Sequence, residues 1–574
     1  MEINGAKMFV KALQEEGVDT LFAYPGGTAI DLFDALYDAE GIDMILPRHE
    51  QALVHAADGY ARSTGRVGVC LVTSGPGATN LVTGIATANY DSVPLVCFTG
   101  QVPLNLIGND AFQEVDIVGI TRSICKYAVT VRKREDLARI IKNAFYIART
   151  GKPGPVVVDI PKDIQLAMGS DEYPSEVNIR GYKPSEGVHV GQIKRALAEL
   201  KNAKKPVFLC GGGVNIAHAR KEMQQLAEKT GIPVVTTIMG KGAIPTDHPL
   251  YVGNIGMHGN LASNKAIMES DVLFSIGCRF NDRITGTIDT FAKNAKIIHV
   301  DIDAASISRN IKVDIPIVAD AKVAISKMLE YAEPLDIKGW VDDIMNVKAE
   351  YPINMNRYDG VTPEAIIRTI NDMYSNLIVT TDVGQNQLWT TQYIDIDENK
   401  QLLTSGGLGT MGYGFPAAIG AKIGNMDKDV ICISGDGGVQ MNIQEMATAV
   451  ALELPVTLCI LNNGYLGNVR QWQELFFNKR YSSTCLRYRR RCNRDCQNPD
   501  KCCPKYSPDF VKLAESYDAK GIRVTKPEEI RPAFEAARAN TNGPTVIEFF
   551  IDPTANVFPM VPGGKSLNDM ILDC

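Results

Sequence analysis

The fold is decided by residues 429–463, where two apolar segments each end in a turn of glycine or asparagine. The segments and turns are DVICIS (429–434), GDGG (435–438), PVTLCIL (455–461) and the pair Asn462-Asn463. Apolar runs of this length on either side of a helical pattern are typical of a βαβ unit, whose right-handed crossover brings both strand ends to one edge of the sheet. The stretch therefore predicts a parallel sheet with Asp436 and Asn463 close together.

The side chains at these two strand ends suit a metal ion. Asp436 and Asn463 offer carboxylate and amide oxygens, which are the hard ligands that Mg²⁺ prefers. The N–H groups of Gly435, Gly437 and Gly438, with the start of the following helix, would bind a diphosphate. A GDG turn alone would favour a plain turn and an asparagine cap. The asparagine pair at this spacing favours a metal–diphosphate site.

The same alternation of apolar β-rich runs and helical patterns extends through most of the chain, as in parallel sheets covered by helices. A polar linker at 169–187 and a charged, helix-like connection separate three blocks, residues 1–168, 188–334 and 361–555. The first and third blocks both have glycine-rich turns after apolar strands, SGPGATN (74–80) and SGDGGVQMN (434–442). We predict an α/β protein of three domains, with parallel sheets flanked by helices and ligand crevices at the strand ends.

Composition restricts the class of protein. The chain has 574 residues, of which 45% are hydrophobic and 22% charged, with a net charge of −7. No apolar run reaches the roughly 20 residues of a membrane helix, and the N-terminal residues have no apolar core of a secretory signal. The negative charge argues against nucleic acid as the main partner. We expect a cytoplasmic protein with neither a membrane nor a nucleic-acid partner.

Five of the thirteen cysteines fall in one polar segment, 485–503. They are Cys485, Cys492, Cys496, Cys502 and Cys503. Their spacing matches no standard zinc or ferredoxin pattern, but the arginines between them should lower thiol pKa values and favour thiolate. We hypothesise a thiolate-rich flap near the active-site entrance that holds zinc or an iron–sulfur cluster, or forms a redox-switched disulfide. The alternative is a disordered basic loop with incidental cysteines.

Further motifs follow one another along nearly the whole chain. They are YPGG (24–27), PRHEQ (47–51), TSGPGATN (73–80), AFQEVDIVGITR (111–122), GKPGPVVVDIPKD (151–163), GMHGN (256–260), RFNDRITG (279–286), GGLGTMGYGFPAAIGA (406–421) and RQWQ (470–473). In this form and order the sequence resembles the catalytic subunits of acetolactate synthases, which are thiamine-diphosphate enzymes. The resemblance implies a pyrimidine-binding first domain, a central domain, and a third domain that binds diphosphate. In that family the cysteine-rich connection is shorter.

The resemblance also implies roles for individual residues. Mg²⁺ would be bound by the side chains of Asp436 and Asn463 and by the carbonyl of Tyr465. Thiamine diphosphate would contact Pro25, Gly26, Gln385, Gly409, Met411, Gly435, Gly437, Gly438 and Val469, with Met411 supporting its bent shape. The active site would include Gly27, Glu50, Phe112, Gln113 and Lys162. Trp472 would shape the pocket for the second substrate, where the alternative for a lone tryptophan is core packing.

Glu50 is the residue most expected to be catalytic. A protonated carboxyl beside the pyrimidine ring promotes proton loss from the thiazolium carbon, and burial would raise its pKa as this role requires. Neighbours such as Leu46 and Leu53 make the segment apolar. From this segment alone, Glu50 could equally be a helix-start glutamate paired with Arg48 or His49.

The central block matches positions at which the family binds FAD. These are Gly211, Gly212, Gly213, Thr237, Met257, Arg279, Arg283, Asp301 and Asp320. The chain departs from the family pattern at Asn281 in RFNDR, at Lys152 where arginine is usual, and at Asn386 where many relatives have histidine. Lysine and arginine are not equivalent at phosphate, so the Lys152 departure bears on flavin affinity.

The implied reaction is decarboxylation of pyruvate and transfer of the two-carbon unit to a second 2-keto acid. A second pyruvate would give 2-acetolactate, and 2-ketobutyrate would give 2-aceto-2-hydroxybutyrate, in branched-chain amino-acid biosynthesis. Implied partners are further copies of the chain, in a homodimer or tetramer, and a regulatory small subunit. The alternatives are a pyruvate oxidase, a decarboxylase that releases free aldehyde, or another carboligase of the same superfamily.

Overall fold

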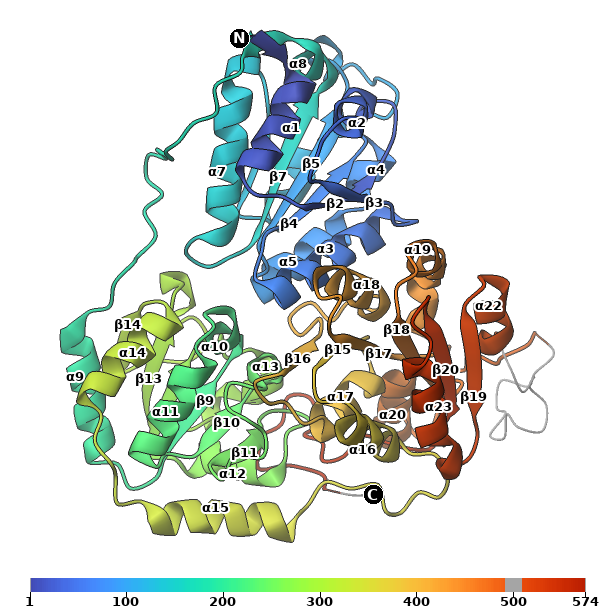
Figure 1. The fold of residues 1–574 in the computed structure, drawn as a ribbon. Coiled ribbons are helices and arrows are strands. Elements are labelled where there is room, and N and C mark those ends of the chain that lie inside the picture. Colours follow the sequence, from blue (N-terminus) through green and yellow to red (C-terminus); the bar gives the residue numbers. More distant parts are fainter. Residues whose placement is uncertain (1, 491–507, 573–574) are drawn as a thin grey trace.

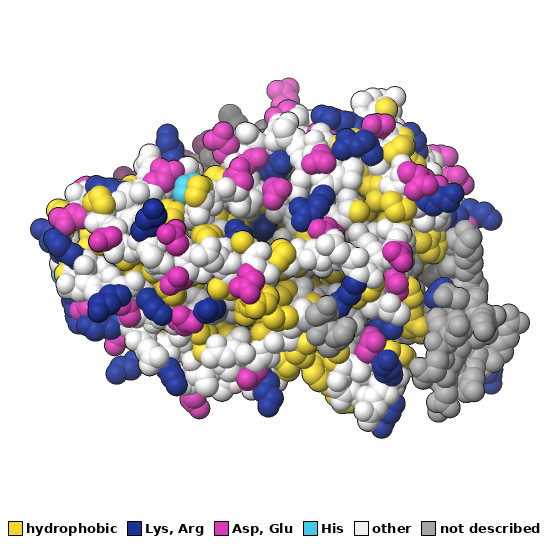
Figure 2. Space-filling model, turned by 90° about the horizontal axis from the view of Figure 1, so that it is seen from below, with side chains coloured by type: hydrophobic (Ala, Val, Ile, Leu, Met, Phe, Trp, Pro, Cys, Tyr) yellow, Lys and Arg dark blue, Asp and Glu magenta, His cyan; other side chains and the backbone are white. Residues whose placement is uncertain are grey.

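The computed structural model describes residues 2–490 and 508–572. Three α/β units lie around the centre of the molecule, each built on a six-stranded parallel sheet with helices packed on it (Figure 1). This confirms the predicted fold class. None of the described helices is long and apolar enough to cross a membrane. On the face shown in Figure 2, lysine and arginine side chains are interspersed with aspartate and glutamate, so neither sign of charge forms a continuous field there.

The first sheet has the strand order β3-β2-β4-β5-β7-β6. Its strands are β2 (Thr20–Tyr24), β3 (Asp43–Ile45), β4 (Gly68–Val72), β5 (Leu95–Gln101), β6 (Tyr127–Thr130) and β7 (Pro155–Pro161). Its helices are α1 (Gly5–Glu15), α2 (Ile30–Tyr37), α3 (Glu50–Thr64), α4 (Pro76–Thr79), α5 (Val82–Asp91), α6 (Ile117–Thr121), α7 (Leu137–Arg149) and α8 (Lys162–Leu166). A short antiparallel pair, β1 (Glu2–Asn4) with β8 (Met168–Ser170), ties the N-terminus to the start of the expected linker.

The central sheet has the order β11-β10-β9-β12-β13-β14. Its strands are β9 (Pro206–Cys210), β10 (Val234–Thr236), β11 (Tyr251–Asn254), β12 (Val272–Ile276), β13 (Lys296–Asp301) and β14 (Ile315–Val318). Its helices are α9 (Val190–Lys201), α10 (Gly212–Ile216), α11 (Arg220–Thr230), α12 (Leu261–Glu269), α13 (Asp282–Thr285) and α14 (Ala321–Tyr331). In chain order this is the 3-2-1-4-5-6 arrangement of dinucleotide-binding folds, whose crevice lies between the neighbouring strands β9 and β12.

The third sheet has the order β16-β15-β17-β18-β20-β19. Its strands are β15 (Leu377–Thr381), β16 (Lys400–Leu403), β17 (Asp429–Gly435), β18 (Val456–Asn462), β19 (Lys520–Val524) and β20 (Thr545–Phe550). Its helices are α16 (Pro363–Met373), α17 (Gln385–Tyr393), α18 (Gly414–Gly424), α19 (Met446–Ala451), α20 (Gly467–Phe476), α22 (Phe510–Ser516) and α23 (Ile530–Arg538), and α15 (Lys338–Glu350) is the connection that precedes them. The chain-order pattern equals that of the first sheet, which confirms their shared plan.

Two of the contacts between domains are especially close. Helix α3 of the first domain crosses α18 of the third so closely that a Cβ on Gly59 would collide with the carbonyl of Ala417, and one on Gly420 with the carbonyl of Ala56. After β20 the chain runs back to the central domain, where Val561 donates its N–H to the Met257 carbonyl at 2.8 Å and is buried in the central core. Because backbone meets backbone at the first contact, α3 has little freedom to move against the third domain.

His55 is buried in the middle of α3, where it packs edge-to-face against Tyr413 with ring centroids 5.4 Å apart. Neither ring nitrogen has a hydrogen-bond partner among the described residues. Burial lowers the pKa of His55 to about 3, with a smaller contribution from the charge of Arg62. The folded protein therefore holds this histidine neutral, while the unfolded chain takes up a proton below about pH 6.5.

His55 should consequently make the protein less stable in mild acid. Its contribution is fully present above about pH 6.5 and is lost as the pH falls below that value, by about 1.4 kcal/mol between pH 7.5 and 5.5. His55→Gln should reduce the loss of unfolding free energy over this range by that amount. Denaturation at the two pH values measures it, with His218→Gln, at an exposed histidine, as the control. An unchanged pH dependence in His55→Gln would contradict the assignment.

Candidate active site

The predicted residues of the first domain gather at the carboxyl edge of its sheet. The YPGG turn after β2 lies against the turn after the neighbouring β4, where the Thr28 hydroxyl is 3.0 Å from that of Thr73 and accepts from the Ser74 N–H at 3.0 Å. Lys162, after β7, donates to the Gly27 carbonyl at 3.2 Å and pairs with Asp31 at 3.4 Å. Lys162 therefore contacts the turn that contains Pro25 and Gly26, with its side chain partly exposed.

Glu50 is the first residue of α3 and is partly exposed in this single chain. The Asn80 side-chain N–H donates to Glu50 Oε2 at 2.9 Å, and a Cβ on Gly77 would lie 3.5 Å from Oε1. His49 caps the helix by accepting from the Gln51 N–H, so the helix-start part of the alternative is correct, but Glu50 bonds to Asn80. Asn80, the hydrogen-bond partner of Glu50, is the last residue of SGPGATN. The sequence had indicated that segment only as a glycine-rich turn after an apolar strand.

Phe112 and Gln113 lie in the loop after β5. The Phe112 side chain is 86% exposed, which is unusual for a large aromatic residue in an isolated chain. Gln113 has a φ of 59° and packs so tightly against Gly75 that a Cβ there would lie 2.8 Å from the Gln113 carbonyl oxygen. This places Gln113 beside the turn that leads to Asn80, with Phe112 directed outward.

Asp436 and Asn463 meet at adjacent strand ends, as the sequence predicted. Strands β17 and β18 pair in parallel, which brings the ends of both strands to the same edge of the sheet. Burial raises the pKa of Asp436 to about 7, although the nearby backbone N–H groups of Asn463 and Gly464 act to lower it. Asn463 donates to Gln385 at 3.2 Å and accepts from the Tyr465 N–H at 3.0 Å. The turn thus combines a buried carboxylate with converging amide groups.

The loop that contains Met411 is held beside this turn by Asp382, a residue that the sequence reasoning missed. The Asp382 carboxylate accepts from the Gly412 N–H at 3.0 Å, and burial raises its pKa to about 6. A Cβ on Gly437 would lie 3.7 Å from Met411 Cε. The signal for Asp382 was present, because it directly follows the apolar strand LIVTT just as Asp436 directly follows the strand DVICISG.

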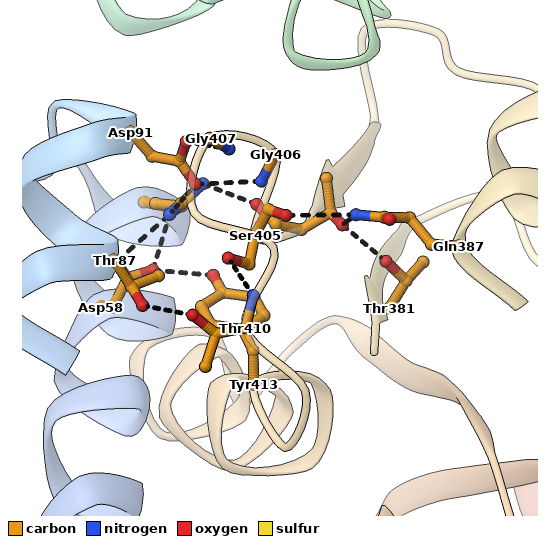
Figure 3. Close-up of polar contacts among 12 residues, drawn as sticks. Asp58, Thr87, Asp91, Thr381, Gln387, Ser405, Gly406, Gly407, Thr410 and Tyr413 are labelled. Atoms are coloured by element: carbon orange, nitrogen blue, oxygen red, sulfur yellow. Dashed lines mark hydrogen bonds and ion pairs between the residues drawn. The ribbon is translucent and has the colours of Figure 1, made fainter. Parts of the chain in front are cut away.

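A buried charge cluster joins the same loop to the first domain (Figure 3). The Arg62 guanidinium lies between two carboxylates, 2.6 Å from Asp58 and 3.0 Å from Asp91. Asp91 in turn accepts from the N–H groups of Gly406 and Gly407, and the Tyr413 hydroxyl donates to Asp58 at 2.7 Å. The first domain therefore holds the GGLGTMGYG loop near both of its ends, through backbone N–H groups at Gly406 and Gly407 and through the side chain at Tyr413.

Removing the cation from this cluster should be costly. Arg62→Ala would leave two buried carboxylates without compensation, and we expect the free energy of unfolding to fall by about 3–5 kcal/mol. Arg66→Ala serves as the control, because its pair with Asp19 is half exposed and contributes about 1 kcal/mol or less. Chemical denaturation followed by circular dichroism measures both. Equal losses of unfolding free energy in the two variants would show that the cluster stabilises the protein no more than an exposed ion pair does.

A cavity of about 1950 Å³ opens between the three domains. It is lined by the predicted residues Gly211, Gly212, Gly213, Thr237, Met257, Arg279, Arg283, Asp301, Asp320, Gly409, Val469 and Trp472. The cavity begins at the carboxyl ends of β9 and β12, the point at which a dinucleotide-binding sheet binds its ligand. The structure therefore brings the expected flavin-binding positions into one space, next to Trp472 of the third domain.

The three glycines after β9 also have a packing role. A Cβ on Gly213 would lie 2.6 Å from the Gly277 Cα, and one on Gly211 would collide with the Gly277 carbonyl. A Cβ on Gly212 would be 3.1 Å from the Met239 side chain. Close contact between the turns after β9 and β12 thus requires glycine at two of the three positions, whatever the cavity contains.

Trp472 lies on α20 at the wall of this cavity. Its ring packs edge-to-face on Phe476 and lies 6.0 Å from the Arg283 guanidinium carbon. Arg283 also contacts the Met257 sulfur at 3.6 Å. The indole is only partly buried, and its N–H has no partner among the described residues. Trp472 thus faces a group of central-domain residues across the domain boundary.

Most of the cysteine-rich segment lies outside the described residues, including Cys492, Cys496, Cys502 and Cys503. Cys485 is described. Its thiol forms no disulfide, and its backbone forms an antiparallel β-bridge with Tyr465. In the part of the chain that the structure describes, no group of three or more histidine, cysteine or acidic residues could hold a metal ion. The thiolate-rich flap therefore stays a hypothesis.

Comparison with known proteins gives the class to which this fold and site belong. Residues 3–120 match the N-terminal TPP binding domain of thiamine pyrophosphate enzymes, residues 193–328 their central domain, and residues 382–549 their C-terminal TPP binding domain. Thiamine pyrophosphate is another name for thiamine diphosphate. The three matches contain all three six-stranded sheets in large part, and they support the implied domain order.

Curated relatives narrow the class. The probable acetolactate synthase large subunit of Methanococcus aeolicus is 46% identical over 592 residues, which cover 99% of this chain and 95% of that protein. The acetolactate synthase large subunit of Corynebacterium glutamicum is 46% identical, with 99% and 90% covered. The acetolactate synthase isozyme 3 large subunit of Escherichia coli is 42% identical, with 99% and 98% covered. This chain belongs to the family of acetolactate synthase large subunits.

Proposed function

We propose that this chain decarboxylates pyruvate and joins the two-carbon unit to a second 2-keto acid, forming 2-acetolactate or 2-aceto-2-hydroxybutyrate. The observation that carries the proposal is the Asp436–Asn463 turn, a buried carboxylate and amide at adjacent strand ends. Thiamine diphosphate, when bound, supplies the carbon nucleophile and the electron sink. The chain's own residues bind and orient it, exclude water and hold a proton.

The residues present fit Mg²⁺ and a diphosphate. Burial disfavours the charged form of Asp436, and a divalent cation at the carboxylate would offset that cost. Asn463 and the Tyr465 carbonyl add neutral oxygen ligands, and Mg²⁺ commonly completes its shell with phosphate oxygens and water. In the proposal, the N–H groups of Gly437 and Gly438 bind the diphosphate, as in other glycine turns that bind phosphate.

Glu50 would hold the proton that is shared with the pyrimidine ring. The Asn80 N–H bonds to Oε2, so Oε1 is left for the coenzyme, and Gly77 lies beside Oε1 without a side chain to block the ring. Lys162, tied to the Gly27 carbonyl, would offer a positive charge to a substrate carboxylate at the same sheet edge.

Glu50→Gln should keep the coenzyme bound while it abolishes carboligation. Only the shared proton is removed, so exchange of the C2 hydrogen of bound thiamine diphosphate should slow by a factor of ~100 or more. NMR after acid quench measures the exchange, and a colorimetric acetoin assay with pyruvate, Mg²⁺ and coenzyme measures the product. Wild-type turnover without acetolactate, or with oxygen consumption, would favour the decarboxylase or oxidase alternatives. Unchanged exchange in Glu50→Gln would refute the role of Glu50.

The site as proposed is completed by a second copy of the chain. Within one chain Glu50 bonds to Asn80 of its own domain, while Asp436 is enclosed by residues of the third. The side chains of Phe112 and Glu50 are exposed or partly exposed here, and a partner's third domain would cover them. We infer at least a homodimer in which Glu50 of one copy faces Asp436 of the other.

A mixture of inactive chains tests this arrangement. Glu50→Gln and Asp436→Ala subunits are each expected to be inactive, but a hybrid dimer would contain one site with both residues intact. Subunits mixed under conditions of exchange should recover about a quarter of the wild-type activity, if one of the two sites works in the half of all dimers that are hybrid. Mass spectrometry of differently tagged chains verifies the exchange. Verified hybrids without activity would rule out the shared site.

The cavity supports two further parts of the proposal. Its place at β9 and β12, with Arg279 and Arg283 among its lining, suits the diphosphate of FAD held for a structural purpose. Trp472, at its wall, would favour the ethyl group of 2-ketobutyrate over the methyl of pyruvate, because a fully buried methylene contributes about 0.8 kcal/mol. The relatives are named large subunits, which supports a small-subunit partner for this chain. We also propose that two of the dimers can associate as a tetramer.

A further inference from the structure

The chain returns to the Asp436–Asn463 turn after helix α20. Residues 484–487, here called the return segment, run antiparallel to residues 464–466. Leu466 donates its N–H to the Thr484 carbonyl at 2.9 Å, and Leu486 donates to the Gly464 carbonyl at 2.9 Å. The Thr484 hydroxyl also donates to the Gln473 side chain of α20 at 2.9 Å. The return segment is therefore bound to the backbone that directly follows Asn463.

This pairing places two side chains of the return segment on the glycine turns. A Cβ on Gly464 would lie 2.6 Å from Arg487 Nε, so the Arg487 side chain occupies the space that only glycine leaves open. Gly464 has a φ of 74°, which glycine adopts without strain. On the other side, a Cβ on Gly437 would lie 3.4 Å from Leu486 Cδ1. Leu486 thus packs over the GDG turn while Arg487 lies over the asparagine turn.

The charge of Arg487 lies beside the Asp436–Asn463 turn. Its Nε is buried, and the side chain packs on Gly464, the residue after the proposed metal ligand Asn463. A fixed cation beside a metal ligand would repel Mg²⁺ unless an anion of higher charge were shared between them. A diphosphate supplies that anion, and paired use of Arg or Lys with Mg²⁺ on phosphate oxygens is a common solution to its charge.

We propose that Arg487, in the return segment, is a binding residue for the diphosphate of the coenzyme. The planar guanidinium would donate N–H groups to terminal phosphate oxygens from the side of Gly464, opposite to the N–H groups of the GDG turn. The inference rests on the proposed function, since it takes the Asp436–Asn463 turn as the site of Mg²⁺ and diphosphate.

The test compares Arg487→Gln with Arg490→Gln, which changes an exposed arginine three residues further on. Isothermal titration at saturating Mg²⁺ gives the Kd of thiamine diphosphate and of thiamine monophosphate. Arg487→Gln should raise the Kd of thiamine diphosphate by ~10-fold or more, as loss of a hydrogen bond to a charged group does, and change that of the monophosphate less. Arg490→Gln should change neither. Arg487→Lys, which keeps the charge without the planar donors, should fall between.

The outcomes separate this inference from the proposed function. Wild-type protein that fails to bind thiamine diphosphate removes the proposed function and the role of Arg487 with it. Wild-type binding with an unchanged or lower Kd in both Arg487 variants overturns the role of Arg487 alone, and a lower Kd would mean that Arg487 competes with Mg²⁺ for Asp436. Thermal unfolding of each variant checks the fold, and if Arg487→Gln does not fold, the Arg487→Lys titration decides.

Discussion

The contact between α3 and α18 is the constraint on which the rest of the structure depends. Glycines on both helices let their backbones touch. The buried ion pairs of Arg62 with Asp58 and Asp91 fix the C-terminal half of α3 as well. Helix α3 begins at Glu50, so the helix that holds the GGLGTMGYG loop also sets the position of the proposed catalytic carboxyl. Buried charges at such a boundary favour one register of docking over others, because any other leaves them unpaired.

Repetition of one sheet plan explains why the site residues lie where they do. In the first sheet the predicted turns and site residues follow β3, β2, β4, β5 and β7, and in the third sheet they follow β16, β15, β17 and β18. Parallel pairing brings these strand ends to one edge of each sheet. The central sheet has a different order and forms its crevice between β9 and β12. The predicted site residues of each domain thus lie at one sheet edge, and the cavity between the domains connects the central edge with the third.

Predictions from the sequence succeeded where the relevant residues are linked by local pattern. Asp436 and Asn463 each follow an apolar run, so parallel pairing was enough to bring them together. Asp382 has the same signal but was missed, because no ligand chemistry drew attention to it. Arg62 had no local signal at all. Its role depends on a loop 342 residues away, and a helix-surface arginine beside an aspartate at i−4 reads as an ordinary exposed pair.

The sequence by itself determined the α/β class, the three blocks, the strand-end placement of Asp436 and Asn463, and the family. These follow from short-range periodicity and from motifs whose order is kept along the chain. Only the tertiary structure decided which groups from distant parts of the chain come into contact: Asn80 with Glu50, Asp382 with the Met411 loop, and Arg487 with Gly464. The physical reason is that desolvation and hydrogen bonding depend on neighbours in space, and helix packing chooses those neighbours from parts of the chain that share no pattern.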